Sequence, residues 1–467
     1  MSFWKIAWRN IEQRALASSL TAVSMALGVA VMIAVIVIHS VTVRQFSEDA
    51  QGYHLIVGGK GGSLQLVLST VYYLGQPLYP IPYSYYKKFV DGEFKDMTEV
   101  AVPECLGDSY QAPDNSVFRV VATTPDLFDK IHYGTNPDGS LKSYGFEPGG
   151  RNFKTENFFE GVIGSVVAAH SGLKVGDTFQ PSHGLAGGND LHHAVKIVGI
   201  LKPTGTANDR ALFMNIEGFY LIPGHALSAQ HEEAAADDSS GPAAATGQPD
   251  AKESAAEEQH EHELERELDR QLEQGQAKPL PEAQREVTSI LVLCKNFGEM
   301  RLSQAINKGK ERMAQAVAPS REVTMLLNNF IGPIRIVLMV LTVLIIIVAG
   351  ISILVSIYNS MSERSHDIAV MRALGASRGA VMAIVLVESI LLSLGGGLLG
   401  MLLAHTMIGL ISPYVESQTG VTLGLFQFDP KEMMLIPALV VLASLVGFLP
   451  AMSAYRTDVA KALAGSR

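Results

Sequence analysis

The sequence predicts a membrane protein with four transmembrane α-helices and a large α+β extracytoplasmic domain between the first and second helices. Two observations lead to this fold class: four long apolar stretches, and a separation of roughly 290 residues between the first two, which is enough for an independently folded domain. A helix of about 20 apolar residues crosses the hydrocarbon core of a bilayer, and each stretch is that long. The stretches are residues 16–41, 334–357, 380–411 and 433–455.

The first apolar stretch follows Lys5, Arg9 and Arg14, as the apolar region of a secretory signal peptide would. Its apolar run is longer than the usual roughly 7–15 residues and ends without a small-residue cleavage site. We therefore interpret residues 16–41 as an uncleaved membrane anchor. Residues 1–15 are predicted to form a cytoplasmic amphipathic N-terminal segment.

The distribution of basic residues predicts the orientation in the membrane. Lys and Arg outnumber acidic residues in segments 1–15, 358–379 and 456–467, whereas the loop 412–432 is acidic. Because short cytoplasmic loops carry an excess of Lys and Arg, both termini and the loop 358–379 are expected in the cytoplasm. Residues 42–333 and 412–432 are then extracytoplasmic.

The extracytoplasmic segment 42–333 contains short β-branched runs separated by Gly and Pro, with helical patterns between them. The predicted strands are residues 118–123, 161–164, 195–201 and 289–294, and the predicted helices are residues 83–94 and 302–316. This mixture is typical of an α+β domain. The two cysteines, Cys105 and Cys294, both lie here, where a disulfide is chemically permitted; two unpaired buried thiols are the alternative.

A low-complexity insert interrupts this domain at residues 225–286. Between His231 and Gln274, fourteen Asp and Glu residues stand against three basic residues, which accounts for the chain's formal net charge of −10. The rest of the chain is close to neutral. No basic surface for nucleic acid is therefore indicated.

Histidines in and before the insert form a candidate metal site. Imidazole and carboxylate groups are suitable ligands for zinc and similar ions. The candidate ligands are His225, His231, His260 and His262, with help from His183, His192 and His193 earlier in the domain. The alternative is a solvated acidic insertion with incidental histidines, since no close spacing such as His-x₃-His is present.

The loop 358–379 carries the most informative pattern. Ile368, Met371 and Leu374 recur at helical spacing, which predicts a short amphipathic helix at the cytoplasmic membrane surface. Gly375 suits the position that ends a helix, and Ser377 can cap the next helix. The polar residues of this helix are Glu363, Arg364, Asp367 and Arg372. A connector that only rests on the membrane is the alternative.

Several segments, in the same order along the chain, resemble FtsX/MacB-like (type VII) ABC transporter permeases. The segment from Ser362 to Ser377 and the apolar stretch after it resemble the coupling-helix region of that family. Both ends are similar to its flanking signatures, AWRNI…RALASSLTAVSMALGVAV and PAMSAYRTDVAKAL. Two segments of the external domain resemble pieces of a MacB-like domain, VIGSVVAAHSGLKVGDTF and IVGILKPTGTANDRALFMNIEGF. The histidine-bearing acidic insert departs from the family pattern.

The resemblance implies a non-catalytic permease subunit in a bacterial inner (plasma) membrane. Its coupling helix would dock on a separate cytoplasmic ABC ATPase through Ile368, Met371 and Leu374, with Glu363, Arg364 and Arg372 setting the register. ATP hydrolysis there would move the external domain, an action called mechanotransmission. The chain contains no G-x-x-x-x-G-K-[ST] motif, so ATP and Mg²⁺ are expected in the ATPase and no cofactor in this chain. The other expected partners are a second permease copy (identical or a paralogue), a periplasmic partner protein or lipoprotein, and membrane lipid.

Three other functions remain alternatives: a permease for divalent metal such as zinc, a membrane-anchored ligand sensor, and a membrane-anchored enzyme.

Glu388 is an ionisable residue inside the third apolar stretch, for which we favour a structural or coupling role over a proton relay. The run Gly395–Gly400 formally matches G-x-G-x-x-G but lies within an apolar stretch. Close packing of helices explains these small residues better than dinucleotide binding.

Overall fold

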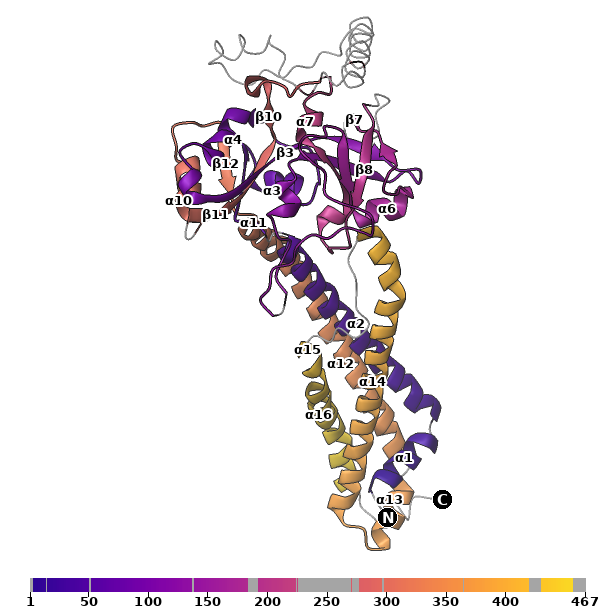
Figure 1. Cartoon of the computed structure of the whole chain (residues 1–467). Coiled ribbons are helices and arrows are strands. Elements are labelled where there is room, and N and C mark those ends of the chain that lie inside the picture. The colour runs from indigo at the N-terminus through magenta and orange to yellow at the C-terminus, as the bar shows by residue number, and fades with distance from the viewer. Residues whose placement is uncertain are drawn as a thin grey trace, which may run out of the picture. The chain divides into compact units, whose positions relative to one another are not determined.

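The computed structural model describes residues 3–13, 15–49, 52–136, 138–183, 192–223, 225, 270, 277–295, 298–363, 365–419 and 430–456. The chain divides into two compact units (Figure 1). The helical unit comprises Met1–Arg44, Leu327–Tyr414 and Thr422–Arg467, and the α/β unit comprises Gln45–Leu326 and Val415–Val421.

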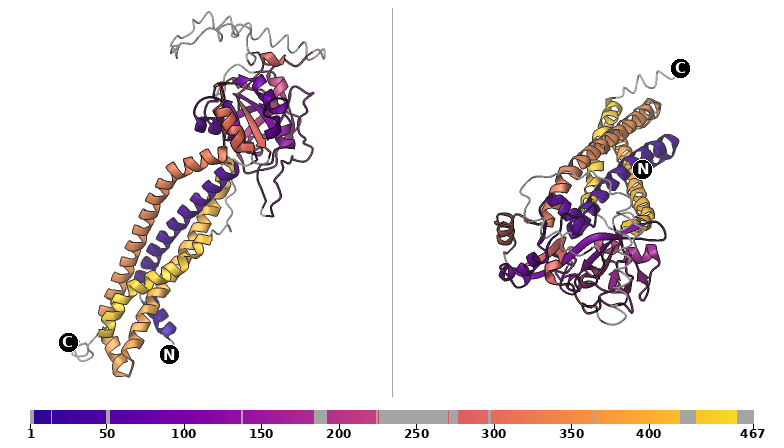
Figure 2. Two further views of the ribbon diagram at one scale, coloured as in Figure 1. Left: turned by 90° about the vertical axis from the view of Figure 1, so that its left-hand side faces the viewer. Right: turned by 90° about the horizontal axis from the view of Figure 1, so that it is seen from above.

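The helical unit consists of long apolar helices that lie lengthwise beside one another (Figures 1 and 2). Its described elements are α1 (Phe3–Gln13), α2 (Ala15–Asp49), the π-helical turn η4 (Leu327–Ile331), α12 (Gly332–Glu363), α13 (Ser365–Ala373), α14 (Arg378–Thr419), α15 (Pro430–Met433) and α16 (Leu435–Arg456). Helix α1 presents Trp4 and Trp8 to the exterior, which is typical of an amphipathic helix at a membrane interface. The predicted amphipathic N-terminal segment is therefore a helix.

Three helices in the described part of the chain are long and apolar enough to cross a membrane. They span Ala15–Val41, Pro319–Val348 and Arg378–Val415, and they correspond to the first three predicted spans. The fourth predicted span, 433–455, is also helical, as α16, but its apolar segment Pro437–Met452 is shorter than a typical membrane span. The fourth crossing therefore stays a prediction.

Glycines of α14 allow close packing of the helices. A Cβ atom at Gly396 would lie 2.8 Å from Met25 Cβ of α2, and one at Gly400 would lie 2.5 Å from the carbonyl oxygen of Ala26. Within the same run, a Cβ atom at Gly397 would lie 2.4 Å from Leu439 of α16. Small residues that let helix backbones approach are characteristic of membrane helix interfaces. This geometry agrees with the packing interpretation of the run Gly395–Gly400.

The α/β unit is built on one large mixed sheet. Its strands are β1 (Leu55–Gly59), β3 (Thr98–Gln111), β4 (Val117–Thr123), β5 (Glu160–Ile163), β6 (Thr178–Phe179), β7 (Ser182–His183), β8 (Val195–Ile200), β9 (Ala211–Asn215), β11 (Ser289–Cys294) and β12 (Ala314–Val317). The order is β12-β1-β11-β3-β4-β9-β5-β8-β6, with β7 also paired to β3. The pairs β4/β9 and β5/β8 are parallel and the other pairs are antiparallel.

Helices and a small second sheet complete this unit. Strands β2 (Ile81–Pro82) and β10 (Glu286–Val287) pair with each other. The helices are α3 (Ser63–Val71), α4 (Tyr83–Val90), α5 (Asp126–Asp129), α6 (Ser165–Ser171), α7 (Ile216–Phe219), α10 (Gly298–Asn307) and α11 (Pro319–Leu326), with 3₁₀ turns η1 (Lys95–Met97), η2 (Ala207–Arg210) and η3 (Glu282–Gln284). The α+β class is confirmed.

All four predicted strands are present, as β4, β5, β8 and β11, within one residue of the expected ends. The predicted helix 302–316 is wrong in its second half, because α10 ends at Asn307 and Ala314–Val317 is strand β12. The side-chain amide of Asn307 donates to the carbonyl oxygen of Ala316 (2.8 Å) and accepts from its N–H (2.9 Å). Pairing of β12 with β1 at the sheet edge therefore outweighs the local helical pattern.

Cys105 and Cys294 are both free and buried. They lie on adjacent strands, but Cys294 of β11 pairs with Thr98 of β3, seven residues from Cys105. At about 3.4 Å per residue, the two cysteines are offset by roughly 24 Å along the strands, so no disulfide can join them. Burial raises the pKa of Cys105 to about 12 and that of Cys294 to about 11, which keeps both thiols protonated.

Candidate metal centre and coupling helix

The candidate metal centre begins with Asp108, a buried carboxylate on the long strand β3. The register between β3 and β4 shifts between Leu106 and Ser109, which marks a β-bulge around Asp108. Bulges turn a side chain away from the regular alternation of a strand. On its other side β3 pairs with the short strand β7, and this pairing places His183 directly opposite Asp108.

Two further histidines are held beside this pair by backbone hydrogen bonds. The N–H of His192 donates to the carbonyl oxygen of Pro181 at 2.9 Å, just before β7. The N–H of His225 donates to the carbonyl oxygen of Ile222 at 3.3 Å, after α7. The imidazole of His225 also packs on the ring of Phe219, with the ring centroids 4.2 Å apart.

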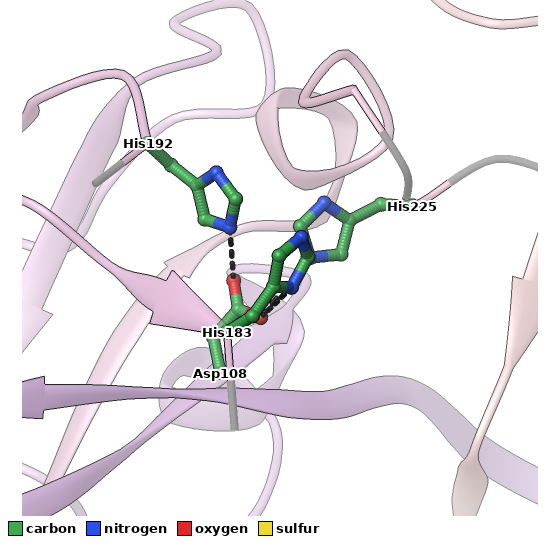
Figure 3. A group of neighbouring side chains, drawn as sticks. All are labelled: Asp108, His183, His192 and His225. Atoms are coloured by element: carbon green, nitrogen blue, oxygen red, sulfur yellow. Dashed lines mark hydrogen bonds and ion pairs between the residues drawn. The ribbon is translucent and has the colours of Figure 1, made fainter. Parts of the chain in front are cut away.

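The three imidazole rings surround the carboxylate of Asp108 (Figure 3). Asp108 Oδ1 lies 3.1 Å from His225 Nε2 and 3.4 Å from His183 Nδ1, and Asp108 Oδ2 lies 3.9 Å from His192 Nε2. One donor atom from each of the four residues can be chosen such that all four lie within 4.8 Å of one another. Asp108 and His192 are buried, whereas the side chain of His183 is 40% exposed.

The histidines keep this buried carboxylate ionised. Burial alone would raise the pKa of Asp108, but hydrogen bonds from His183 and His225, with the charges of His225 and His192, lower it below its ordinary value. The centre therefore combines one anionic oxygen donor with three imidazole nitrogens. This set of ligands is typical of zinc and similar divalent transition metals.

Sequence reasoning found part of this centre. His225 was a predicted ligand and His183 and His192 were predicted helpers, and the fold brings these three together. His193 does not belong to this group; its ring packs at a tilt against Phe159, with the ring centroids 4.1 Å apart. The other predicted ligands, His231, His260 and His262, lie outside the described residues. Asp108 was missed; the only sequence signal was the adjacent Gly107 inside a strand pattern, which is typical of a bulge.

The predicted helix of the loop 358–379 is present as α13. It ends in a Schellman motif: the N–H of Gly375 donates to the carbonyl of Arg372 (3.1 Å) and the N–H of Ala376 to the carbonyl of Met371 (3.0 Å). Gly375 has φ +101°, as the terminating position requires. Ser377 Oγ accepts from the N–H of Ala380 at 3.2 Å and caps α14. Both helix-end predictions are confirmed.

The three residues predicted to dock on the ATPase differ in their exposure in the structure. Ile368 is only 4% exposed and belongs to the core of the helical unit, with Met371 packed partly against the same core. Leu374 is 84% exposed and Val370 is 38% exposed. The three predicted anchors therefore do not share one exposed face, because the spans on either side of α13 already bury Ile368.

Three of the four polar residues predicted for this helix lie in the described part of the chain. Glu363 is the last residue of α12, Asp367 lies within α13, and Arg372 lies in its last turn. Arg364 lies outside the described residues.

Glu388 and His405 of α14 each make a polar contact within the helical unit. Glu388 of α14 is buried, and Asn10 Nδ2 of α1 donates to Glu388 Oε2 at 3.4 Å. Further along α14, His405 Nε2 lies 3.0 Å from Glu432 Oε2 of α15, and this pair is also buried. The sequence predicts Glu432 in the external loop 412–432 and gives no signal for its pairing with His405. The contact between Glu388 and the N-terminal helix supports a structural or coupling role for this carboxylate.

Comparison with known proteins assigns both parts of the chain. The model of the MacB-like periplasmic core domain matches residues 18–262, more than half of the 467 residues, and that of the FtsX-like permease C-terminal region matches residues 339–459. The macrolide export ATP-binding/permease protein MacB of Shewanella sp. (strain W3-18-1) is 35% identical over 127 residues, and that of Bordetella avium (strain 197N) is 34% identical over the same length. Each match covers 27% of this chain and 18% of the relative, less than a fifth of its length.

Among solved structures, the periplasmic region of MacB from Actinobacillus actinomycetemcomitans aligns with a TM-score of 0.29 and 9% identity, covering 60% of this chain and 95% of that one. The extracellular domain of the transporter YknZ from Gram-positive bacteria aligns with a TM-score of 0.26 and 10% identity, covering 56% and 98%. The two matching family models together include the apolar helices and most of the α/β unit. The chain belongs to the FtsX/MacB-like family of ABC transporter permeases.

Proposed function

We propose that this chain is the permease subunit that transmits the energy of ATP hydrolysis, by a separate cytoplasmic ABC ATPase, to its extracytoplasmic α/β unit. Family membership supports the transporter assignment. The observation that carries the coupling step is α13, a short helix between two long apolar helices, whose C-terminal end is closed by hydrogen bonds and is followed directly by the exposed apolar residue Leu374.

The packing of α13 supports a role in transmitting force from the ATPase to the adjoining helices. Ile368 packs in the core that also contains Ile357 of α12 and Val381 of α14. A force applied to the exposed side of α13 is therefore passed to both adjoining helices, since close-packed interiors transmit strain. On this proposal Val370 and Leu374 contact the ATPase, while Ile368 and Met371 hold the helix to the spans.

The proposed assembly contains two permease copies and two ATPases in a bacterial inner membrane, with both termini and α13 in the cytoplasm. ATP and Mg²⁺ bind to the ATPase chains, and the external units do mechanical work such as export, extraction or hand-over of a substrate. A periplasmic protein or lipoprotein and membrane lipid are the expected contacts on the outer side.

Co-purification with a candidate cytoplasmic ABC ATPase from the same organism tests the proposal. Leu374→Asp and Val370→Asp should each abolish retention of the ATPase and stimulation of its activity, because a carboxylate cannot enter an apolar groove without a large desolvation cost. Met433→Asp is the matched control, since Met433 is similarly exposed, at 73%, and is the first residue of the fourth predicted span, next to the predicted external loop. Unchanged ATPase retention by Leu374→Asp and Val370→Asp would contradict the proposed docking face.

A further inference from the structure

We infer that Asp108, His183, His192 and His225 form a binding site for a divalent transition-metal ion, with Zn²⁺ as the ion that fits best. The inference concerns the α/β unit alone and does not depend on coupling to an ATPase. Its basis is the convergence of three imidazoles on one buried carboxylate, with the four donor atoms within 4.8 Å of one another.

Ordinary ion pairing does not account for this arrangement. The ring centroids of the three histidines are only 4.3, 4.8 and 5.1 Å apart, so more than one protonated ring would bring like charges together in a partly buried site. A single carboxylate needs at most one such charge as a counterion. A metal cation requires neutral imidazole ligands, and a bound cation would take the place of the imidazole protons that face Asp108 in the metal-free site.

The carboxylate itself also points to a cation. Asp108 Oδ2 is buried and accepts no hydrogen bond in the described part of the chain. A buried charged oxygen without a hydrogen bond is costly, and a metal ion would satisfy it. The position of Asp108 supports the same conclusion. It lies at a β-bulge of β3, a strand in the middle of the sheet rather than at an exposed edge, and faces the histidines.

The distances fit a closed four-coordinate site after small side-chain movements. In a tetrahedral zinc site with bonds of about 2.0–2.1 Å, neighbouring ligand atoms are roughly 3.3 Å apart. Asp108 Oδ1 lies 3.1 and 3.4 Å from the nitrogens of His225 and His183, and Asp108 Oδ2 lies 3.9 Å from that of His192. One donor atom from each of the four residues lies within 4.8 Å of the other three. Calcium and magnesium prefer several oxygen ligands, whereas this site has one carboxylate, so neither ion should compete.

The ligands come from separate segments of the chain, which gives the ion a structural consequence. Asp108 lies on β3, His183 ends β7, His192 precedes β8, and His225 begins the predicted insert 225–286. A bound ion would therefore link His225, the first residue of the predicted insert, to the central sheet. Metal binding should stabilise this unit, because the ligands are brought together only in the folded state.

Metal titration of the purified full-length protein in detergent, after removal of metal with a chelator, tests the site. One Zn²⁺ should bind per chain by calorimetry and elemental analysis, and Co²⁺ should give the intense visible absorption of a four-coordinate centre. His183→Gln and Asp108→Asn should each weaken binding at least about 100-fold, since even outer-shell changes cost 10- to 100-fold. His183 is the first choice because its partial exposure makes misfolding of the variant unexpected.

Matched controls separate this site from other histidines. His170→Gln removes an imidazole outside the centre, which pairs with Asp114 at 2.6 Å, and His193→Gln removes the residue next to a ligand; neither change should alter Zn²⁺ affinity. A variant with His231, His260 and His262 all changed to Ala should keep the single tight site.

Folding of each variant is checked by the melting temperature of the metal-free protein. Zn²⁺ should raise the melting temperature of the wild type and of the three control variants but not that of His183→Gln. Wild-type zinc affinity in His183→Gln would overturn the inference, as would loss of tight binding in the variant that lacks only His231, His260 and His262. If Asp108→Asn does not fold, the result for His183→Gln decides the matter.

Discussion

At the scale of single residues, Glu104 and Asp108 show how surroundings decide the charge of a buried carboxyl group. Both lie on β3, four residues apart, and both are buried. Burial raises the pKa of Glu104 to about 8, with only a hydrogen bond from Ser289 Oγ (3.2 Å) acting against the shift. Asp108 is surrounded by three imidazoles and has a lowered pKa. Glu104 is therefore protonated at neutral pH, whereas Asp108 is ionised.

The protonated state of Glu104 predicts a pH-dependent stability. Between pH 4.5 and about 8 the folded protein keeps a proton that the unfolded chain releases, so the free energy of unfolding falls as pH rises through this window. Glu104→Gln mimics the protonated carboxyl group and should remove this loss, which amounts to about 3 kcal/mol at pH 7. Melting temperatures of the α/β unit in the full-length protein, measured from pH 5 to pH 8, should fall less steeply for the variant.

Glu99→Gln is the control for this measurement, because Glu99 is exposed on the same strand. Its melting temperatures should follow those of the wild type across the series. A wild-type protein whose stability rises from pH 5 to pH 8 in step with the Glu104→Gln variant would show that Glu104 is ionised in the folded state.

At the scale of single elements, α14 depends on glycine where it meets α2. Gly400→Ala would place a Cβ atom 2.5 Å from the carbonyl oxygen of Ala26 and 2.8 Å from Val29 Cβ, both too close for van der Waals contact. The expected cost is about 1–3 kcal/mol, because a well-packed interface must separate to admit the new atom. The thermal stability of the detergent-solubilised protein should fall accordingly.

Gly395→Ala provides the matched control within the same glycine run. No atom lies within 4 Å of a Cβ built at Gly395, and Ala is a better helix former than Gly. The melting temperature of this variant should be unchanged or slightly higher. Equal losses in both variants would indicate that the run is sensitive for a reason other than contact with α2.

The turn after α13 makes a second prediction at this scale. Gly375 has φ +101°, a conformation that costs a residue with a Cβ about 1–2 kcal/mol, whereas Gly379 does not have a positive φ and has open space around it. Gly375→Ala should therefore lower both the melting temperature and the stimulation of the partner ATPase. Gly379→Ala should leave both measurements close to the wild type. If Gly375→Ala keeps the wild-type melting temperature and ATPase stimulation, the turn does not require glycine at this position.

At the scale of the whole molecule, the proposed function requires the cytoplasmic helix and the external unit to be linked. Hydrogen exchange compares the nucleotide-free complex with one trapped by a transition-state analogue of ATP hydrolysis. Exchange within Gln45–Leu326 should differ between the two states for the wild type, because ATPase closure moves the spans. The Leu374→Asp variant should show no difference. Identical exchange in both states of the wild type would contradict transmission to the external unit.

The sequence by itself determined the features that depend on local pattern. Apolar length predicted the long helices, β-branched runs predicted β4, β5, β8 and β11, and the spacing of Gly375 and Ser377 predicted the ends of two helices. Each of these follows from the preferences of neighbouring residues. The family resemblance rested on the same local segments, and the matching family models agree with it.

Only the tertiary structure decided which distant residues meet. Asp108 joins His183, His192 and His225 because a bulge in β3 and the pairing of β7 bring together positions up to 117 residues apart. Ile368 turns inward because α12 and α14 bury it, although its spacing matched that of the exposed Leu374. The spacing of apolar residues along a helix predicts which side chains share a face. Whether that face is buried depends on how the other elements pack against it.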